Sequence, residues 1–170
     1  KMEWLGMSQH TEMTLSEKIG PNLPYLRRYA RALTGRQSRG DAYAVTAREA
    51  VLADPAQFSD DVSPKTALFT VFHSIWKSSG AQLNEEESGM AAEALRHLSA
   101  LTDGTREALL LRTLEEFPAE DVAHIMGTTS DEVGDLLDIA YAEMAKSVSG
   151  AVMIIEDAAI IAVDLANIAA

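Results

Sequence analysis

Residues 117–144, FPAEDVAHIMGTTSDEVGDLLDIAYAEM, decide how the rest of the chain is interpreted. Counted from Ala119, the stretch has the spacing of a helix-turn-helix, two helices joined by a tight turn. Gly127 stands where the first helix needs a residue with positive φ, and the small Ala123 stands where the two helices touch. The apolar residues that would pack the helices together are Val122, Met126, Val133 and Leu136. The sequence therefore predicts a helix-turn-helix, with a plain helical hairpin as the alternative.

The starts of both helices are also marked. Pro118 suits the first turn of the first helix, because its missing N–H is not needed there. Ser130 is the predicted N-cap of the second helix, and Asp131 and Glu132 in its first turn favour the helix dipole.

The charge of this motif contradicts DNA binding. Between Thr113 and Ala145 there is no Lys and no Arg, whereas DNA affinity rests mainly on cationic side chains that neutralise phosphates. Carboxylates on the outer face of the second helix would each be repelled by phosphate by on the order of 1 kcal/mol even in water. The acidic residues of the span are Glu115, Glu116, Glu120, Asp121, Asp131, Glu132, Asp135, Asp138 and Glu143. We therefore expect no direct DNA binding and a protein partner instead; the alternative is a solvated acidic face without a role.

The composition points the same way. The chain has 170 residues and a net charge of −12, which disfavours nucleic acid as a partner. It contains no cysteine, which fits a reducing cytoplasm, and no apolar run long enough to span a membrane. There is no Gly-rich phosphate loop, and the four histidines stand apart. We therefore do not expect an enzyme, and the Glu115–Glu116 pair is interpreted as solvated charge.

The body of the chain is predicted to be helical in two halves. Residues 1–13 form a leader that we expect to be disordered, and residues 81–89 a polar linker between the halves 14–80 and 90–147. The expected helices are a short one capped by Ser16, one ending at Gly35, one over 41–53, one opening at Pro64, and one capped by Thr102 or Asp103. The aromatic stripe after Pro64 is interpreted as core. Residues 18–48 are basic and 115–143 acidic, so the halves could dock on each other.

The tail, residues 148–170, has a different character. A short apolar run, residues 152–155, ends in two carboxylates and is followed by an apolar helix-like segment. A buried parallel strand followed by a helix is one interpretation, and one further amphipathic helix is the other. An exposed apolar tail could also exchange between molecules, which leaves a tail-exchanged dimer open.

Three stretches together resemble a known family. NLPYLRRYARALTG (22–35), the aromatic helix after Pro64, and the stretch from Asp103 to Met144 resemble the sigma-factor-like domain of PhyR-type general stress response regulators. The first half resembles region 2 of extracytoplasmic-function sigma factors, and the second resembles region 4. VMIIEDAAIIAVDL (152–165) resembles the first strand and helix of the receiver domain that follows in this family.

The resemblance implies an all-α sigma-like fold and an anti-anti-sigma function. Such a module mimics a sigma factor, sequesters an anti-sigma factor of the NepR type and frees the true sigma factor, within cytoplasmic two-component signalling. In a complete receiver domain, Glu156 and Asp157 would help to hold Mg²⁺, whereas the family's phosphoacceptor Asp would lie beyond Ala170. We therefore expect no cofactor, no phosphoacceptor in this chain and a constitutively open module.

We place the expected partner surface in the groove between the two halves and on the second-half helices. Its candidate residues are Leu114, Phe117, Val122, Leu137, Ile139, Tyr141, Asp135 and Asp138. The alternative function is a genuine extracytoplasmic-function sigma factor or DNA-binding regulator. In that case the first half would contact nucleic acid through Arg27, Arg28, Arg31, Arg36 and Arg39.

Overall fold

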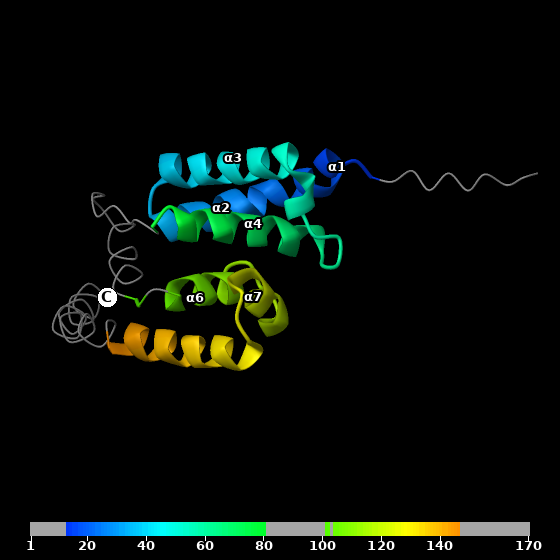
Figure 1. The fold of residues 1–170 in the computed structure, drawn as a ribbon. Coiled ribbons are helices and arrows are strands. Elements are labelled where there is room, and N and C mark those ends of the chain that lie inside the picture. The colour runs from blue at the N-terminus through cyan, green and yellow to red at the C-terminus, as the bar shows by residue number, and fades with distance from the viewer. Residues whose placement is uncertain (1–12, 81–100, 103, 147–170) are drawn as a thin grey trace, which may run out of the picture.

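The computed structural model describes residues 13–80, 101–102 and 104–146, and all regular elements in these ranges are helical (Figure 1). The leader up to residue 12, the linker 81–89 and the tail 148–170 with Glu156 and Asp157 lie outside the described residues. The first half contains α1 (Leu15–Ile19), α2 (Leu23–Thr34), α3 (Gln37–Ala53) and α4 (Pro64–Ser78), with 3-10 turns at Gly20–Asn22 and Pro55–Gln57. The second half contains α6 (Thr105–Thr113), α7 (Ala119–Met126) and a helix over residues 130–146.

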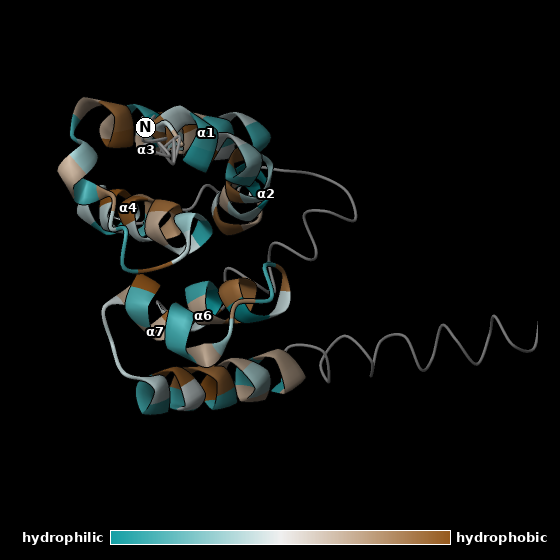
Figure 2. Cartoon of the chain, turned by 90° about the vertical axis from the view of Figure 1, so that its right-hand side faces the viewer, coloured by the Kyte–Doolittle hydropathy of each residue, from teal (hydrophilic) through white to brown (hydrophobic). Residues whose placement is uncertain are grey.

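The halves form two layers that share one core. In Figure 1, α1 to α4 make the upper layer, and α6, α7 and the helix 130–146 make the lower one. The central helix is α4, whose Phe69, Phe72 and Trp76 have no exposed surface. Tyr29 of α2 packs on two of these rings, with centroid distances of 5.3 Å to Phe69 and 5.6 Å to Phe72. The expected aromatic core is thereby confirmed. Figure 2 shows hydrophobic residues, in brown, along the helices of both layers.

The helix-turn-helix prediction is confirmed in its geometry. Gly127 follows α7 with φ 67°, and two bonds close the helix end: Thr128 N–H donates to the Ala123 carbonyl at 2.9 Å, and Gly127 N–H to that of His124 at 3.3 Å. This is the pattern in which a left-handed residue satisfies the last carbonyls of a helix. Val122 and Val133 are fully buried where the two helices meet.

Three helix starts differ from the sequence-based expectation. Thr14, not Ser16, caps α1, because its hydroxyl accepts from Glu17 N–H while the Glu17 carboxylate accepts from Thr14 N–H. Helix α3 begins at Gln37 rather than Asp41, so Gly40 lies inside the helix. Thr129, not Ser130, caps the helix 130–146, since its hydroxyl accepts from Glu132 N–H at 3.2 Å.

The start of α6 is also different. Its cap is Gly104, with φ 84°, whose N–H donates to the Glu107 carboxylate at 2.8 Å. Thr102 was one of the two expected caps, but its N–H and hydroxyl both donate to Glu143, at 3.0 and 2.6 Å. Thr102 therefore ties the segment before α6 to the helix 130–146, a long-range role that local spacing does not reveal.

Gly40 lies where α2 and α3 cross most closely. A Cβ atom at this position would stand 2.6 Å from both the Cα and N of Arg31 and 2.8 Å from the carbonyl carbon of Ala30. These neighbours are backbone atoms, which cannot rotate away, so the two helices would have to separate. At Gly134, in the helix 130–146, an added Cβ atom would meet no atom within 4 Å.

The two glycines therefore predict opposite effects of the same change. Gly40→Ala should lower the free energy of unfolding by about 2–3 kcal/mol through overpacking. Gly134→Ala should raise it by up to about 1 kcal/mol, because alanine is the better residue in an exposed helix interior. Urea unfolding followed by circular dichroism measures both changes. Equal effects of the two substitutions would contradict the close crossing at Gly40.

His73 is the buried titratable group of α4. It is 4% exposed, and neither ring nitrogen has a hydrogen-bond partner among the described residues. Burial, followed by the nearby positive charge of Lys77, lowers the pKa of His73 from 6.5 to about 4, while Glu107 acts in the opposite direction. The neutral form is therefore the one that the folded core accommodates.

This gives a pH dependence with a definite sign. Because the pKa of His73 is lower in the folded than in the unfolded chain, its contribution is fully present above pH 6.5 and is lost as the pH falls toward 4. Over that window, the wild type should lose up to about 3 kcal/mol of unfolding free energy through this group. The variant His73→Leu should lack this loss, whereas His124→Leu, at an exposed histidine, should retain it. Equal pH slopes for wild type and His73→Leu in urea unfolding would refute the assignment.

Candidate protein-interaction site

The two halves meet along one face of α4. Lys65, Phe69, His73 and Lys77 follow one another at intervals of four residues, so they form a row on this face. The Phe69 ring lies 5.0 Å from that of Phe117, edge to face at 71°, and Lys77 Nζ donates to the Met126 carbonyl at 3.3 Å. We call the contact between this row and the second half the seam.

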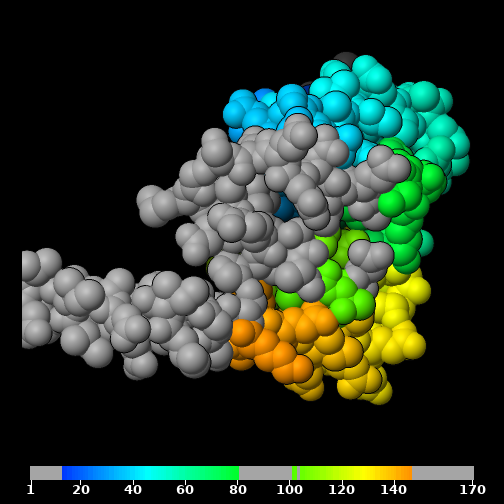
Figure 3. Space-filling view, turned by 90° about the vertical axis from the view of Figure 1, so that its left-hand side faces the viewer, coloured from blue at the N-terminus to red at the C-terminus, as the bar shows by residue number. Residues whose placement is uncertain are grey.

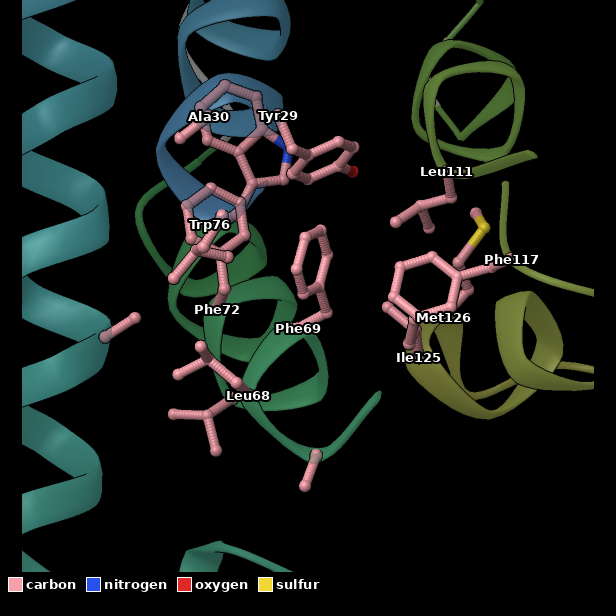
Figure 4. Close-up of a cluster of buried hydrophobic side chains, with 14 of the residues drawn as sticks. Tyr29, Ala30, Leu68, Phe69, Phe72, Trp76, Leu111, Phe117, Ile125 and Met126 are labelled. Atoms are coloured by element: carbon pink, nitrogen blue, oxygen red, sulfur yellow. The ribbon is translucent and has the colours of Figure 1, made fainter. Parts of the chain in front are cut away.

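The seam is packed rather than open. Figure 4 shows Tyr29 and Phe69 from the first half directed toward Leu111, Phe117, Ile125 and Met126 from the second. These residues belong to one continuous core cluster. In the space-filling view of Figure 3 the coloured atoms of the two halves are likewise in contact. The groove expected between the halves is therefore filled along α4 by side chains of both.

Glu115 closes the seam at one end. Its side chain is 0% exposed, and both carboxylate oxygens accept from Arg28, at 2.9 and 3.0 Å. Lys65 Nζ lies 3.3 Å from the same carboxylate and donates to the Glu115 carbonyl at 3.0 Å. The bond to Glu115 in turn raises the pKa of Arg28. The expectation that the basic first half docks on the acidic second half is thus confirmed.

The interpretation of the Glu115–Glu116 pair as solvated charge was wrong for Glu115. Glu116 is exposed and has φ 58°, the left-handed conformation, which costs about 1–2 kcal/mol in a residue other than glycine. Its neighbours Glu115 and Phe117 are both buried against the first half.

Lys65 Nζ lies 4.5 Å from the Phe117 ring centroid and 4.8 Å from that of Tyr25, which adds cation–π attraction to the ion pair.

A buried polar contact also joins the halves near the Lys77 end of α4. Trp76 Nε1 donates to the Glu107 carboxylate at 3.0 Å, and both side chains are buried. Glu107 also accepts from Gly104 N–H, so one carboxylate both caps the start of α6 and holds the indole of α4. Sequence reasoning missed Glu107, because a Glu in the first turn of a helix is ordinarily explained by the helix dipole.

The expected partner residues fall into three groups. Phe117 and Val122 are buried in the core, so a partner could reach them only if the seam opened. Leu114 and Leu137 are partly buried. Ile139, Tyr141, Asp135 and Asp138 are exposed.

The exposed group lies on the helix 130–146. At about 100° per residue, Asp135 and Asp138 share its outer face, with Ile139 on one flank and Tyr141 on the other. Chemically, this face can offer carboxylates to a cationic partner and one apolar side chain on each flank. In the described part of the chain, no group of three or more His, Cys, Asp or Glu could hold a metal ion. No helix there combines the length and apolarity that crossing a bilayer requires.

Comparisons with known proteins identify both halves. Residues 19–73 match the family model described as the Sigma2 domain of PhyR, and residues 98–147 match that of the sigma-like domain of the response regulator PhyR. The Phyllosphere-induced regulator PhyR of Methylorubrum extorquens is 37% identical over 153 residues, 90% of this chain. The chain spans 57% of that relative's length.

Solved structures of PhyR proteins are similar to the described fold. The PhyRSL–NepR complex from Sphingomonas sp. Fr1 is similar with a TM-score of 0.68 and 40% identity, covering 79% of this chain and 88% of that one. PhyR complexed with the anti-sigma factor NepR from Bartonella quintana has a TM-score of 0.68 and 30% identity, over 79% of this chain and 51% of that one.

The sigma factor RpoE from Bartonella quintana, complexed with NepR, has a TM-score of 0.66 over 79% of this chain and 96% of that one, at 18% identity, which shows a shared fold. The helical fold of the described residues is thus that of a sigma factor, as the sequence predicted. From the matches to both sigma-like parts and the identity to solved relatives, the chain belongs to the PhyR family of response regulators.

Proposed function

We propose that this chain is a sigma-mimicking module that sequesters a NepR-type anti-sigma factor and so releases the sigma factor which that protein inhibits. The observation that carries the proposal is a helix-turn-helix without a single Lys or Arg from Leu114 to Met144. The relatives solved in complex with NepR support the choice of partner. The role is that of a regulator in a two-component general stress response rather than of an enzyme.

The second helix of the helix-turn-helix has the shape of a DNA-reading helix but an acidic outer face. A helix-turn-helix reads DNA through the outer face of its second helix, and in this chain that face carries Asp135 and Asp138. Phosphate contacts supply most of the affinity of DNA-binding proteins, and carboxylates oppose them. The shape that a sigma factor presents is retained while its DNA chemistry is absent. A protein that recognises the sigma shape is therefore the partner that fits.

The partner surface that we propose consists of two exposed parts. One is the face of the helix 130–146 with Ile139, Tyr141 and the two aspartates; the other is the edge of the seam at Leu114. Apolar anchors supply most of the binding energy in such interfaces, whereas charges at the rim govern association rate and specificity. Phe117 and Val122 would act indirectly in the observed conformation, by supporting this surface from the core.

We further propose that residues 148–170 are the beginning of a receiver domain. The similarity to the Methylorubrum extorquens regulator extends over 153 residues of this chain. Only 147 residues precede the tail, so the similarity must include part of the tail. That similarity therefore supports a continuation of the family pattern beyond the sigma-like part. Glu156 and Asp157 would then contribute to a Mg²⁺ site in the complete receiver.

Titration with the NepR-type anti-sigma factor tests the proposed function. Calorimetry should find a one-to-one complex with a dissociation constant in the nanomolar range. Ile139→Ala should weaken it about tenfold through the loss of an apolar anchor. Val45→Ala on α3 is the matched control, since Val45 is 50% exposed and Ile139 46%, and it should leave the affinity within about twofold. Absence of binding at micromolar concentration would refute the function, and equal effects of both variants would refute the surface.

The absence of DNA recognition is a separate prediction. Fluorescence anisotropy with duplex promoter DNA at physiological salt should give no saturable binding below about 10 μM, because phosphates meet carboxylates. The variant Asp135→Lys/Asp138→Lys should gain weak, salt-sensitive DNA binding if the acidic charge of this face is what prevents it. Submicromolar binding by the wild type would favour the alternative of a genuine sigma factor.

A further inference from the structure

A basic surface lies beside the seam in a chain whose net charge is −12. Helix α2, LPYLRRYARALT, contains three arginines and no acidic residue. Arg27, Arg28 and Arg31 line one surface hollow together with Pro24. We call these four residues the α2 basic hollow. The partner surface described above does not include it.

Asp41 of α3 holds two of the three arginines. Arg31 donates from Nε and Nη2 to its two oxygens, both at 2.8 Å, and Arg27 does the same at 3.2 and 3.3 Å. The bonds from Arg31, then those from Arg27, hold the pKa of Asp41 far below its usual range. One carboxylate thus serves two guanidinium groups and leaves one positive charge in excess.

At the seam, Glu115 is shared by Arg28 and Lys65, and the neighbouring exposed Glu116 also acts on the positive charge of Arg28. In both clusters the carboxylate binds the Nε–Nη2 edge of each arginine, and Nη1 of Arg27, Arg28 and Arg31 makes no hydrogen bond to another described residue. The guanidinium groups are therefore fixed in place while donors remain for a ligand, which lowers the entropic cost of binding.

We propose that the α2 basic hollow binds a carboxylate-rich segment of the anti-sigma partner. The inference rests on the proposed function and adds the chemistry of the partner. The planar fork of arginine matches a carboxylate in two parallel hydrogen bonds, and the chain's own Asp41 and Glu115 are held in this way. The excess positive charge of the Arg27–Arg31–Asp41 cluster and the remaining N–H donors fit a segment that carries carboxylates.

The position of the hollow connects it to the proposed partner surface. Arg28 Nη2 donates to the Leu114 carbonyl at 3.1 Å, so the hollow adjoins the seam edge that the partner is proposed to contact. Tyr25, 44% exposed, lies with its ring centroid 5.4 Å from the Arg28 guanidinium and offers an apolar platform next to the charges. One partner chain could therefore contact Leu114 and the hollow together, with cationic side chains for the acidic helix and carboxylates for the hollow.

The experiment reverses one charge in the hollow. Arg27→Glu leaves the shorter Arg31–Asp41 pair in place, so the packing of α2 on α3 is retained. The matched control is Arg48→Glu, the same charge change at an exposed arginine of α3. Calorimetric titration with the NepR-type anti-sigma factor is performed at about 0.05 M and about 0.3 M NaCl, where screening differs strongly.

The expected result is at least a tenfold loss of affinity for Arg27→Glu at low salt, a smaller loss at high salt, and a change within twofold for Arg48→Glu. Unchanged affinity of Arg27→Glu, or equal losses in both variants, overturns the inference while wild-type binding leaves the proposed function intact. No binding by the wild type overturns both. Binding of duplex DNA that Arg27→Glu abolishes would assign the hollow to nucleic acid and likewise overturn the inference. Equal thermal midpoints of the three proteins exclude a folding defect.

Discussion

The contact on which the arrangement of the halves depends is the burial of Glu115 between Arg28 and Lys65. A carboxylate without exposed surface is tolerated only where cations and hydrogen bonds replace its hydration. Both cations belong to the first half and the carboxylate to the second. The second half therefore cannot move away without separating Glu115 from both cations. Arg28 is 50% exposed and Lys65 25%, so water partly screens both cations, whereas the Glu115 side chain has no exposed surface. This contact therefore contributes, with the apolar packing, to the orientation of the helix-turn-helix on the first half.

Helix α4 connects that charge contact to the core. The row Lys65, Phe69, His73 and Lys77 has a cation at each end and uncharged rings between them. The cations bind the carboxylate of Glu115 and backbone carbonyls of the second half, while Phe69 packs on Phe117. One helix face therefore combines directional polar contacts at its ends with apolar packing in its middle. The polar contacts determine where along α4 the second half sits, and the apolar packing adds to the stability of the contact.

The surface charge of the helix-turn-helix differs from that of a DNA-binding helix-turn-helix. A helix-turn-helix backbone is retained, with Gly127 ending its first helix and Val122 and Val133 at the helix contact. Its outer face bears carboxylates, whereas the excess positive charge lies on α2 of the other half. The described surface thus has carboxylates on one half and a cluster of three arginines on the other. The example illustrates that function resides in the site rather than in the fold.

The order of amino acids is enough to predict the helix-turn-helix, the aromatic core of α4, the ends of α2 and α7 at glycines, and the lack of a DNA-binding charge pattern. These features follow from local rules of periodicity, left-handed caps and charge. Three features become visible only in the folded chain: Glu115 is buried while Glu116 is exposed, Gly40 is required at a helix crossing, and Thr102 binds Glu143. The tertiary structure also moved Phe117 and Val122 from the expected partner surface into the core. The physical reason is that burial and pairing depend on residues many positions away, which no local pattern encodes.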